Sequence, residues 1–586
     1  MPENSAEYMF PTSVKEVRAL GWDYIDIIIF SGDAFMDHPS SGTAMIARVL
    51  QKEGYRVAIV PQPNWRDDLR DFRKLGRPRL FFGVNSGAMD SMVNHYTAAR
   101  RLRSDDAYTP GGKAGQRPDY AVKVYTRILK EIYPDVPVVI GGIEASLRRF
   151  AHYDYWKDCL MPSILIDSGA DCLIYGMGER AIVEIARAYS EGLPTDMVPQ
   201  TVHHYQGAVP ESVSEGALLL SPFSDALKDK SVFVANFNTI EREANRMHPS
   251  VIIETYSDGY VVANPPFPPE TEEELDSWYS LPFTGAPHPR YKDKPIPAFE
   301  MIKNSITVHR GCFGGCSFCT IAAHQGKFIR SRSIANILEE VRRLSSRPHF
   351  RGVISDIGAP TANMYGMGGK DPAKCAKCAR RSCLYPSMCP NLNHSHEKVL
   401  ALYRSVMQSD CVRKAFIGSG IRYDLFLDAE GFLDPSGKEY FEQVVLHHTS
   451  GHFKVAPEHT EDHVLKYMSK PPFALFRTLR REFDRLAVAH GLKYVIVPYF
   501  ISSHPGCTMK DMQSLAAEPA LSGIRLDQVQ DFTPTPMTAS SAMYYSCKDI
   551  VTGKDIFVEK NPERKKQQKS AFLNRPTGFR GKQHRK

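Results

Sequence analysis

The stretch HRGCFGGCSFCTI, residues 309–321, carries three cysteines in a Cys-x3-Cys-x2-Cys pattern, Cys312, Cys316 and Cys319. It follows an apolar run over residues 304–308, which predicts a strand with the cysteines in the loop behind it. Three thiolates this close in sequence can bind three irons of a cubane cluster and leave the fourth iron open. The three glycines of the stretch let the backbone wrap around such a cluster.

Zinc is the alternative metal for this loop, because cysteine thiolates also hold structural zinc. A structural zinc site needs four ligands in a closed tetrahedron, whereas the loop supplies three thiols, so we favour an iron–sulfur cluster. Disulfides are not expected, since the N-terminus lacks a basic segment followed by an apolar one and predicts a cytoplasmic chain. The longest apolar runs fall far short of the roughly eighteen residues that span a bilayer, so no membrane contact is expected.

The cysteine motif resembles that of the radical S-adenosylmethionine (SAM) superfamily, in which an aromatic residue precedes the third cysteine, here Phe318. The resemblance implies a [4Fe-4S] cluster on Cys312, Cys316 and Cys319, whose open iron binds the amino and carboxylate groups of SAM. It also implies one-electron cleavage of SAM to a 5′-deoxyadenosyl radical that abstracts hydrogen from a substrate. The implied partners are SAM, that substrate and an electron donor such as flavodoxin or ferredoxin. The substrate and the catalytic residues are not readable from the sequence.

Five further segments resemble a narrower group, the YgiQ-type radical SAM proteins, so that the resemblance spans most of the chain. They are residues 319–326, 330–333, 355–366, 418–424 and 454–459. Superfamily members usually carry a Gly-Gly-Glu-like stretch after the second strand to meet the methionyl amine, and residues 356–359 hold that place without the glutamate. The resemblance implies cofactor contacts by Phe318, Asp356, Gly358, Ser419, Arg422 and Glu458, the last two at the ends of later strands.

A second cysteine cluster, Cys375, Cys378, Cys383 and Cys389, lies in an insertion over residues 360–395. Four thiols so close together supply a closed ligand set, which predicts a second metal site. Tetrahedral zinc and an auxiliary [4Fe-4S] cluster both remain open, because thiolate spacing alone does not choose between them. The other five cysteines are dispersed, and we assign them no role.

The first part of the chain, residues 1–263, predicts an α/β domain with a doubly wound parallel sheet, Rossmann-like in character. Continuous apolar runs alternate with helical patterns, which is typical of parallel strands covered on both faces. The runs are residues 24–30, 56–60, 79–84, 136–142 and 170–176. Ligands of such sheets lie at the carboxyl ends of the strands, so the loops at 33–42, 141–146 and 176–179 form the candidate pocket.

Many radical SAM enzymes carry such a domain to bind cobalamin, which makes cobalamin an open alternative here. A cobalamin loop normally reads Asp-x-His-x-x-Gly, with the histidine as the lower cobalt ligand. Residues 33–42 offer His38 and Gly42, with one residue too many between them and no aspartate two before the histidine. His38 has two other readings, a cap for the following helix or a pocket-lining residue.

Residues 264–297 hold nine prolines and an acidic run, and we interpret them as a Pro-rich linker. From residue 298 to 559 the β/α rhythm returns and predicts a radical SAM core, a partial (β/α)6 barrel. Its strands are expected at residues 304–308, 351–355, 413–417, 452–455, 493–501 and 526–532. Helices are expected over residues 334–344, capped by Ser333, and over residues 473–490.

The net charge of +7 resides in the last 27 residues, 560–586, where ten lysines and arginines face one acid. This segment is poor in apolar residues, so we expect a disordered basic tail. Such a tail makes RNA a candidate partner. It also supports the alternative to an enzyme, a non-catalytic, metal-stabilised RNA- or ribosome-binding protein.

Overall fold

A parallel sheet forms the centre of the N-terminal half. The computed structural model describes residues 9–522 and 529–573. Five strands run parallel in the order β3-β1-β4-β5-β8, as predicted; they are β3 (Val57–Pro61), β1 (Ile27–Ser31), β4 (Phe81–Asn85), β5 (Val138–Ile140) and β8 (Cys172–Ile174). Counted along the chain this is the order 2-1-3-4-5 of a doubly wound sheet, whose ligand-binding crevice opens beside the first strand.

Successive side chains of β1 point to opposite faces of the sheet, and apolar side chains on both faces explain why helices cover both. Ile27 and Ile29 belong to the core beneath α2 (Gly42–Lys52) and α8 (Glu179–Glu191). Ile28 and Phe30 belong to the opposite core, beneath α5 (Ala121–Ile132) and α7 (Ile164–Ser168). Both faces of the sheet are therefore buried under helices.

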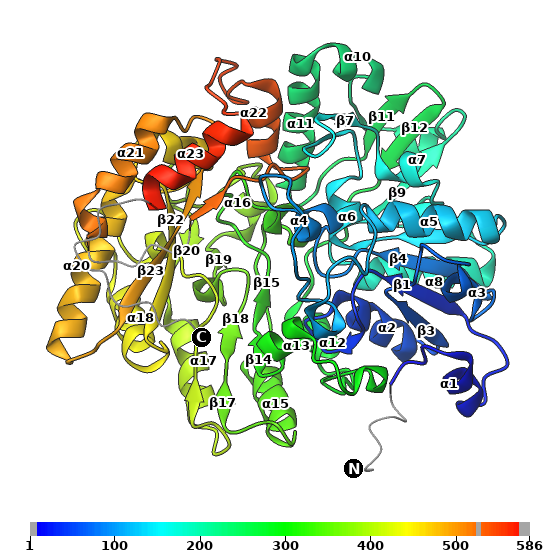
Figure 1. Cartoon of the computed structure of the whole chain (residues 1–586), viewed down its shortest axis with the longest axis horizontal. Helices are drawn as coiled ribbons and strands as arrows, with labels where there is room; N and C mark the ends of the chain where they lie inside the picture. Colours follow the sequence, from blue (N-terminus) through cyan, green and yellow to red (C-terminus); the bar gives the residue numbers. More distant parts are fainter. Residues whose placement is uncertain (1–8, 523–528, 574–586) are drawn as a thin grey trace.

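Four further strands extend the sheet, and the sequence patterns did not predict them. They are β9 (Thr201–Tyr205), β12 (Gly259–Ala263), β11 (Ile252–Tyr256) and β10 (Leu218–Leu219). The β8–β9, β9–β12 and β12–β11 pairs are antiparallel. Helix α11 (Lys230–Ala244) lies before β11 and faces the second half of the molecule (Figure 1).

The second half repeats strand and helix six times. The strands, each near its predicted place, are β14 (Ser305–Thr307), β17 with β18 (Val353–Ile354, Asp356–Gly358), β21 (Lys414–Ala415), β22 (His452–Glu458), β23 (Val495–Ser502) and β24 (Val529–Asp531). All their pairings are parallel and join neighbours in chain order, with a bridge from Ile421 to Val455 between the third and fourth strands. This pattern fits the expected open barrel.

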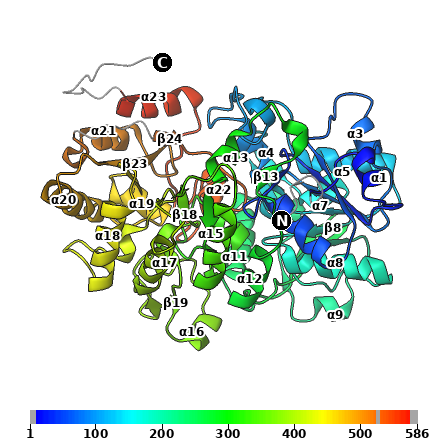
Figure 2. The same cartoon turned by 90° about the horizontal axis from the view of Figure 1, so that it is seen from below.

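Helices follow each of these strands and cover them from outside. They are α15 (Ile334–Ser345), α17 (Glu397–Met407), α18 (Pro435–His447), α19 (Asp462–Met468), α20 (Ala474–Ala489), α21 (Met509–Ala517) and α22 (Ala539–Ser546). The predicted cap is present, since Ser333 Oγ accepts the Asn336 N–H at 3.0 Å. The two halves lie side by side in both views (Figures 1 and 2). Every helix within the described residues is too short or too polar to cross a bilayer.

The interval 264–297, predicted as a linker, is more structured than that word implies. Its acidic run forms α12 (Glu272–Tyr279), begun by a capping box between Thr271 and Glu274. Leu275, Trp278 and Tyr279 are buried together with Met45 and Val49 of α2. The interval therefore packs onto the N-terminal domain, because its apolar residues recur at helical spacing within the acidic run.

The expectation of a disordered tail from residue 560 is wrong for residues 562–573. They form α23 (Pro562–Leu573), in which Phe572 is buried with its ring 5.6 Å from that of Phe500. Lys565 and Gln568 are also buried, on the same helical face as Phe572. The composition of the segment does not reveal this buried face, because two of its three residues, Lys565 and Gln568, are polar side chains with apolar stems. Residues 574–586 lie outside the described part of the chain.

Candidate functional site

The Cys312–Cys319 loop lies behind the first barrel strand, as predicted. It runs from β15 (His309–Arg310) to the short helix α14 (Ile321–Gln325). Two glycines allow its tight path: Gly311 has φ +84° and Gly315 φ +63°. A Cβ would lie 2.2 Å from the Phe328 carbonyl oxygen at the first position and 2.6 Å from Ser382 Cβ at the second. Side chains are excluded at both places, so the backbone itself forms the cradle.

The three thiols are half-buried and have few protein partners. Cys312 Sγ lies 3.4 Å from Thr361 Oγ1 and 3.5 Å from the Gly314 N–H nitrogen. Arg422 donates from Nη1 to Cys316 Sγ at 3.0 Å. Burial raises the pKa of Cys312, and it raises the pKa of Cys319 to about 12. Thiols held in this way ionise when a metal takes the proton's place.

Arg422 and Glu458 lie beside these cysteines. The Arg422 guanidinium is buried and donates to both carboxylate oxygens of Asp424, at 2.8 and 2.5 Å. Glu458 ends β22 with φ +68°, and its carboxylate lies 3.7 Å from Lys470 Nζ. Burial raises the pKa of Glu458, while the Lys470 and Arg422 charges oppose that rise. Asp424 and Lys470 were not predicted; Asp424 stands inside a quoted motif and could have been found there.

Asp356, Gly358 and Ser419 form a separate group at the ends of the second and third barrel strands. Asp356 accepts hydrogen bonds from Ser419 Oγ at 2.6 Å and from the Gly418 and Ser419 N–H groups at 2.7 and 3.2 Å. A Cβ at Gly358 would lie 2.1 Å from the Asp356 carboxylate. The structure thus brings these three residues together, and the Asp356 carboxylate is occupied by hydrogen bonds to the turn at residues 418–419.

The Phe318 side chain packs between the core of the barrel and the apolar cluster of the C-terminal segment. Its ring meets that of His504 edge-on at 6.3 Å. The preceding residue, Ser317, makes three polar contacts with two residues. Its Oγ donates to the Tyr467 carbonyl at 2.7 Å and lies 2.8 Å from Ser540 Oγ. Its carbonyl accepts the Ser540 N–H at 2.9 Å. Phe318 therefore helps to anchor the loop, and its cofactor contact stays a prediction.

Sulfur separations bear on which metal the loop fits. Four sulfurs around one zinc lie roughly 3.8 Å apart, given bonds of about 2.3 Å in a tetrahedron. Among the described residues, which include all seven clustered cysteines, no three of these sulfurs lie within 4.8 Å of one another. In a cubane each cysteine binds a different iron, so wider spacing is expected. The three thiols and their glycine cradle fit a [4Fe-4S] cluster.

The second cysteine cluster adjoins the first. The Cys383 N–H donates to the Phe313 carbonyl at 3.0 Å, and Ser382 Oγ donates to the Gly314 carbonyl at 2.8 Å. Cys375 Sγ accepts from Asn391 Nδ2 at 3.4 Å, and Cys378 Sγ accepts from the Arg380 N–H at 3.4 Å. The thiols at 375, 378 and 389 act electrostatically on Cys383, and burial raises its pKa to about 11. All four predicted residues are therefore brought together.

A cavity of about 1220 Å³ lies at the carboxyl ends of the N-terminal parallel strands. All three predicted loops contribute, through Ser40, Gly141 and Glu179 among others, and Arg310 and His324 close it from the second half. The pocket predicted for this sheet is confirmed as a cavity at the switch point of its topology.

His38 does not serve this cavity. It is buried, its Nδ1 accepts the Ser40 N–H at 3.1 Å, and it is not among the residues that line the cavity. Burial and the charge of Arg347 lower the pKa of His38 to about 3. The residues present do not fit a cobalamin held by a histidine from this loop. His38 instead stabilises its own turn and does not cap α2, whose N-cap is Ser41.

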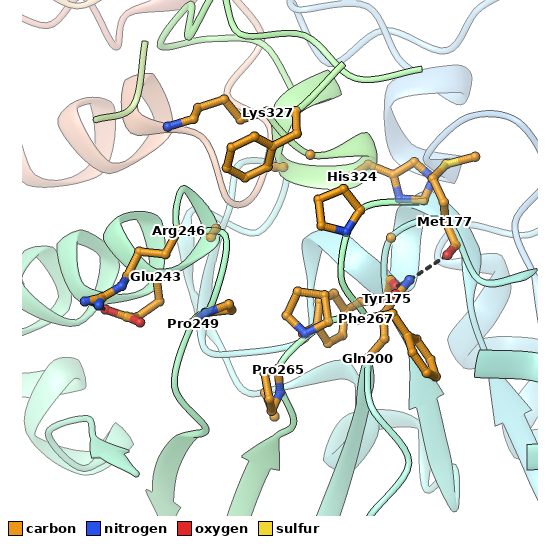
Figure 3. Close-up of a pocket in the computed structure, with 18 of the residues that line it drawn as sticks. Tyr175, Met177, Gln200, Glu243, Arg246, Pro249, Pro265, Phe267, His324 and Lys327 are labelled. Atoms are coloured by element: carbon orange, nitrogen blue, oxygen red, sulfur yellow. Dashed lines mark hydrogen bonds and ion pairs between the residues drawn. The ribbon is translucent and has the colours of Figure 1, made fainter. Parts of the chain in front are cut away.

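Two smaller spaces open on the other side of α14. One is a small cleft lined by Cys316 and Cys319 together with Ala322, Ala323 and Arg149. The other, of about 1030 Å³, is lined by α14, the end of α11 and a run of prolines (Figure 3). Figure 3 shows His324 across the cavity from Pro265 and Phe267, while the Lys327 side chain extends sideways along its upper edge. Arg149 and Lys327 belong to the site but were not predicted, since isolated basic residues carry no motif.

Comparison with known proteins places the chain in a family. The model of the family "Radical SAM N-terminal" matches residues 9–305, and that of "Domain of unknown function (DUF3362)" matches residues 527–575. A UPF0313 protein of Porphyromonas gingivalis is 52% identical over 569 residues, covering 96% of this chain and 90% of the relative. One of Bacteroides thetaiotaomicron is 51% identical, covering 96% and 93%.

Solved structures align with this chain at low identity. The radical SAM methyltransferase TsrM of Kitasatospora setae, with cobalamin and a [4Fe-4S] cluster bound, aligns with a TM-score of 0.48 and 15% identity, over 88% of this chain and 74% of its own. The cobalamin-dependent SAM radical enzyme OxsB aligns with a TM-score of 0.47 and 10% identity, over 92% and 56%. By its family-model match and its close relatives, this chain belongs to the UPF0313 family within the radical SAM superfamily.

Proposed function

We propose that this protein is a radical SAM enzyme whose [4Fe-4S] cluster is held by Cys312, Cys316 and Cys319. When bound, the cluster and SAM would supply one-electron cleavage of SAM to a 5′-deoxyadenosyl radical. The observation that carries the proposal is the spacing of three half-buried thiols on a loop whose glycines leave no room for side chains.

The residues around the loop support this role through charge and shape. Arg422 lies against Cys316, so its positive charge would offset part of the negative charge of a bound cluster. Glu458 and Lys470 supply one negative and one positive group close by, suited to the amino and carboxylate ends of SAM. A small cleft lined by Cys316 and Cys319 marks the side from which the cofactor would approach the cluster.

For the second metal site we propose an auxiliary [4Fe-4S] cluster on Cys375, Cys378, Cys383 and Cys389. Its loop is hydrogen-bonded to the first cysteine loop, which favours a redox-active cluster over a structural zinc. Hydrogen bonds from Asn391 and the Arg380 N–H to sulfur would stabilise a reduced cluster. Because the two cysteine loops are hydrogen-bonded to each other, electrons could pass from one site to the other.

An acidic electron donor of the flavodoxin or ferredoxin kind fits the surface next to this second cluster. Lys370, Lys374 and Lys377 are exposed there, within or beside the cysteine insertion. Opposite charge steers such partners together and is screened by salt. We propose that the chain acts in the cytoplasm; the substrate is left open.

Anaerobic reconstitution with iron and sulfide, followed by reduction and addition of SAM, tests the proposal. Formation of 5′-deoxyadenosine is expected in the wild type and in Cys159→Ala, whose cysteine is exposed and far from both clusters in sequence. It is expected to vanish in Cys316→Ala. Iron content should fall by about half in Cys383→Ala, since one of two four-iron clusters is lost.

Zinc at both sites, with no SAM cleavage, would overturn the proposal and leave the RNA-binding alternative. That alternative relied on the basic segment 560–586, and the structure folds part of it into α23, with Lys565 buried. We therefore do not propose it.

A further inference from the structure

Arg149 is a buried cation without an anionic partner. It follows α6 (Gly142–Leu147) and is 5% exposed. Nη1 donates to the Ser146 carbonyl at 2.7 Å, and the guanidinium carbon lies 4.9 Å from the centre of the Tyr175 ring. In the described part of the chain, no carboxylate lies within 4.0 Å of Arg149, and its Nε and Nη2 donate no hydrogen bond within the protein. Burial lowers the pKa of Arg149.

Other deeply buried arginines of this protein are each paired with a carboxylate. The pairs are Arg48–Asp37, Arg117–Asp106, Arg148–Asp90, Arg310–Glu179, Arg332–Glu340 and Arg422–Asp424. A buried charge left unpaired is costly, so its retention calls for a partner outside the chain. Arg149 differs from its direct neighbour Arg148 in this respect.

The position of Arg149 shows where such a partner would lie. Arg149 lines both the space beside Cys316 and Cys319 and the larger cavity of Figure 3. Ile240, Ala244, Ala322 and Ala323 also line both, so the two spaces are neighbours that share these side chains. A molecule held by Arg149 would reach toward the cysteine loop.

The larger cavity carries an excess of positive charge. Arg149, Arg180, Arg246, Lys327 and Arg330 line it, against two carboxylates, those of Glu243 and Glu270. Lys327 is buried, and its Nζ donates to the Arg380 carbonyl at 2.7 Å, beside the second cysteine cluster. A cavity lined by one sign of charge concentrates ligands of the other sign.

We propose that Arg149 binds an oxyanion group, carboxylate or phosphate, of the substrate and holds the substrate against the cysteine loop. The planar guanidinium still has two free donor positions, which suits a bidentate contact with such a group. The proposal rests on the proposed function, because it assigns the class of substrate for the same site.

The test titrates the full-length protein with inorganic phosphate in one series and with acetate in another, following the melting temperature. Saturable stabilisation by phosphate points to a phosphorylated substrate, and stabilisation by acetate points to a carboxylate. In Arg149→Gln the half-saturating concentration should rise roughly tenfold to a hundredfold, and Arg149→Lys should fall between the two. Arg127→Gln, which changes an exposed arginine of the same domain, should bind like the wild type.

Two control measurements are the melting temperature without ligand and the affinity for SAM. Without ligand, Arg149→Gln should melt no lower than the wild type, because an unpaired buried charge is removed. SAM affinity should be the same in both proteins, whereas a fall in the variant would assign Arg149 to the cofactor and overturn the proposal. Failure of the wild type to respond to either anion would overturn it as well. The titration does not use SAM cleavage, so its failure is distinct from failure of the proposed function.

Discussion

Gly315 lies where the two cysteine loops touch, and replacing it with alanine is expected to separate them. The residue has φ +63°, and the added methyl would lie 2.6 Å from Ser382 Cβ and 2.8 Å from the Arg381 carbonyl oxygen. Ser382 and Cys383 donate the hydrogen bonds that join the loops, so the methyl pushes directly on that junction.

Two costs add at this position. The left-handed backbone costs a residue with a Cβ about 1–2 kcal/mol. Forcing apart two packed loops costs about 1–3 kcal/mol more. The sum, about 2–5 kcal/mol, is large compared with the total stability of a domain, about 5–15 kcal/mol. We expect the loops to release each other and their metal before the rest of the protein unfolds.

The assay is iron content after anaerobic reconstitution, with the melting temperature measured on the same samples. The wild type should hold about eight irons in two four-iron clusters, and Gly315→Ala about four or fewer. Gly420→Ala is the matched control, because a Cβ there meets nothing within 4 Å and its φ is not positive. Full iron content and an unchanged melting temperature in Gly315→Ala would refute this account of the junction.

Three other substitutions test the packing around the site. Phe572→Ala should lower the free energy of unfolding by about 3–5 kcal/mol in urea denaturation, whereas Phe557→Ala, 46% exposed, should change it little; equal effects would mean that α23 is not docked. Arg422→Gln should cost about 3–5 kcal/mol because it leaves the buried Asp424 unpaired, and exchanging both partners for apolar residues should recover most of that; a harmless single variant would argue against the pair. Burial lowers the pKa of Lys565 from 10.5 to about 8, so the folded protein binds fewer protons than the unfolded chain between those values. Relative to Lys565→Met, wild-type stability should therefore rise by up to about 3 kcal/mol from pH 8 to 10.5, and a flat pH profile would contradict the burial.

Strand positions and the two cysteine clusters were predictable because their signals are local. The parallel strands of the N-terminal sheet are apolar runs, and the cysteines of each cluster lie within a few residues of one another in sequence. The strands β9 to β12, most of whose pairings are antiparallel, were not predicted, because the side chains of β12, for example, alternate less clearly and the pairing joins distant segments. Helix α23 was not predicted because the average composition of its segment is dominated by charged residues, which hides the narrow face that is buried.

The charged surroundings of the site were predictable only in part. Arg422 and Glu458 stand in motifs, and the structure places both beside the cysteines. Arg149 and Lys327 are ordinary residues in sequence, and only tertiary folding shows that they line the cavity. Phe318 illustrates the converse: its place before the third cysteine suggested a cofactor contact, while its ring packs against His504.

The hydrogen bonds between Ser317 and Ser540 also have a consequence for when the cluster can be inserted. These residues are 223 positions apart, so the ribosome completes the cysteine loop long before it makes the residue that fastens it. Until then the growing chain presents seven clustered thiols without their final support. Cluster insertion is therefore expected to follow release of the finished polypeptide, and chains truncated before α22 should leave the ribosome as apoprotein, open to oxidation.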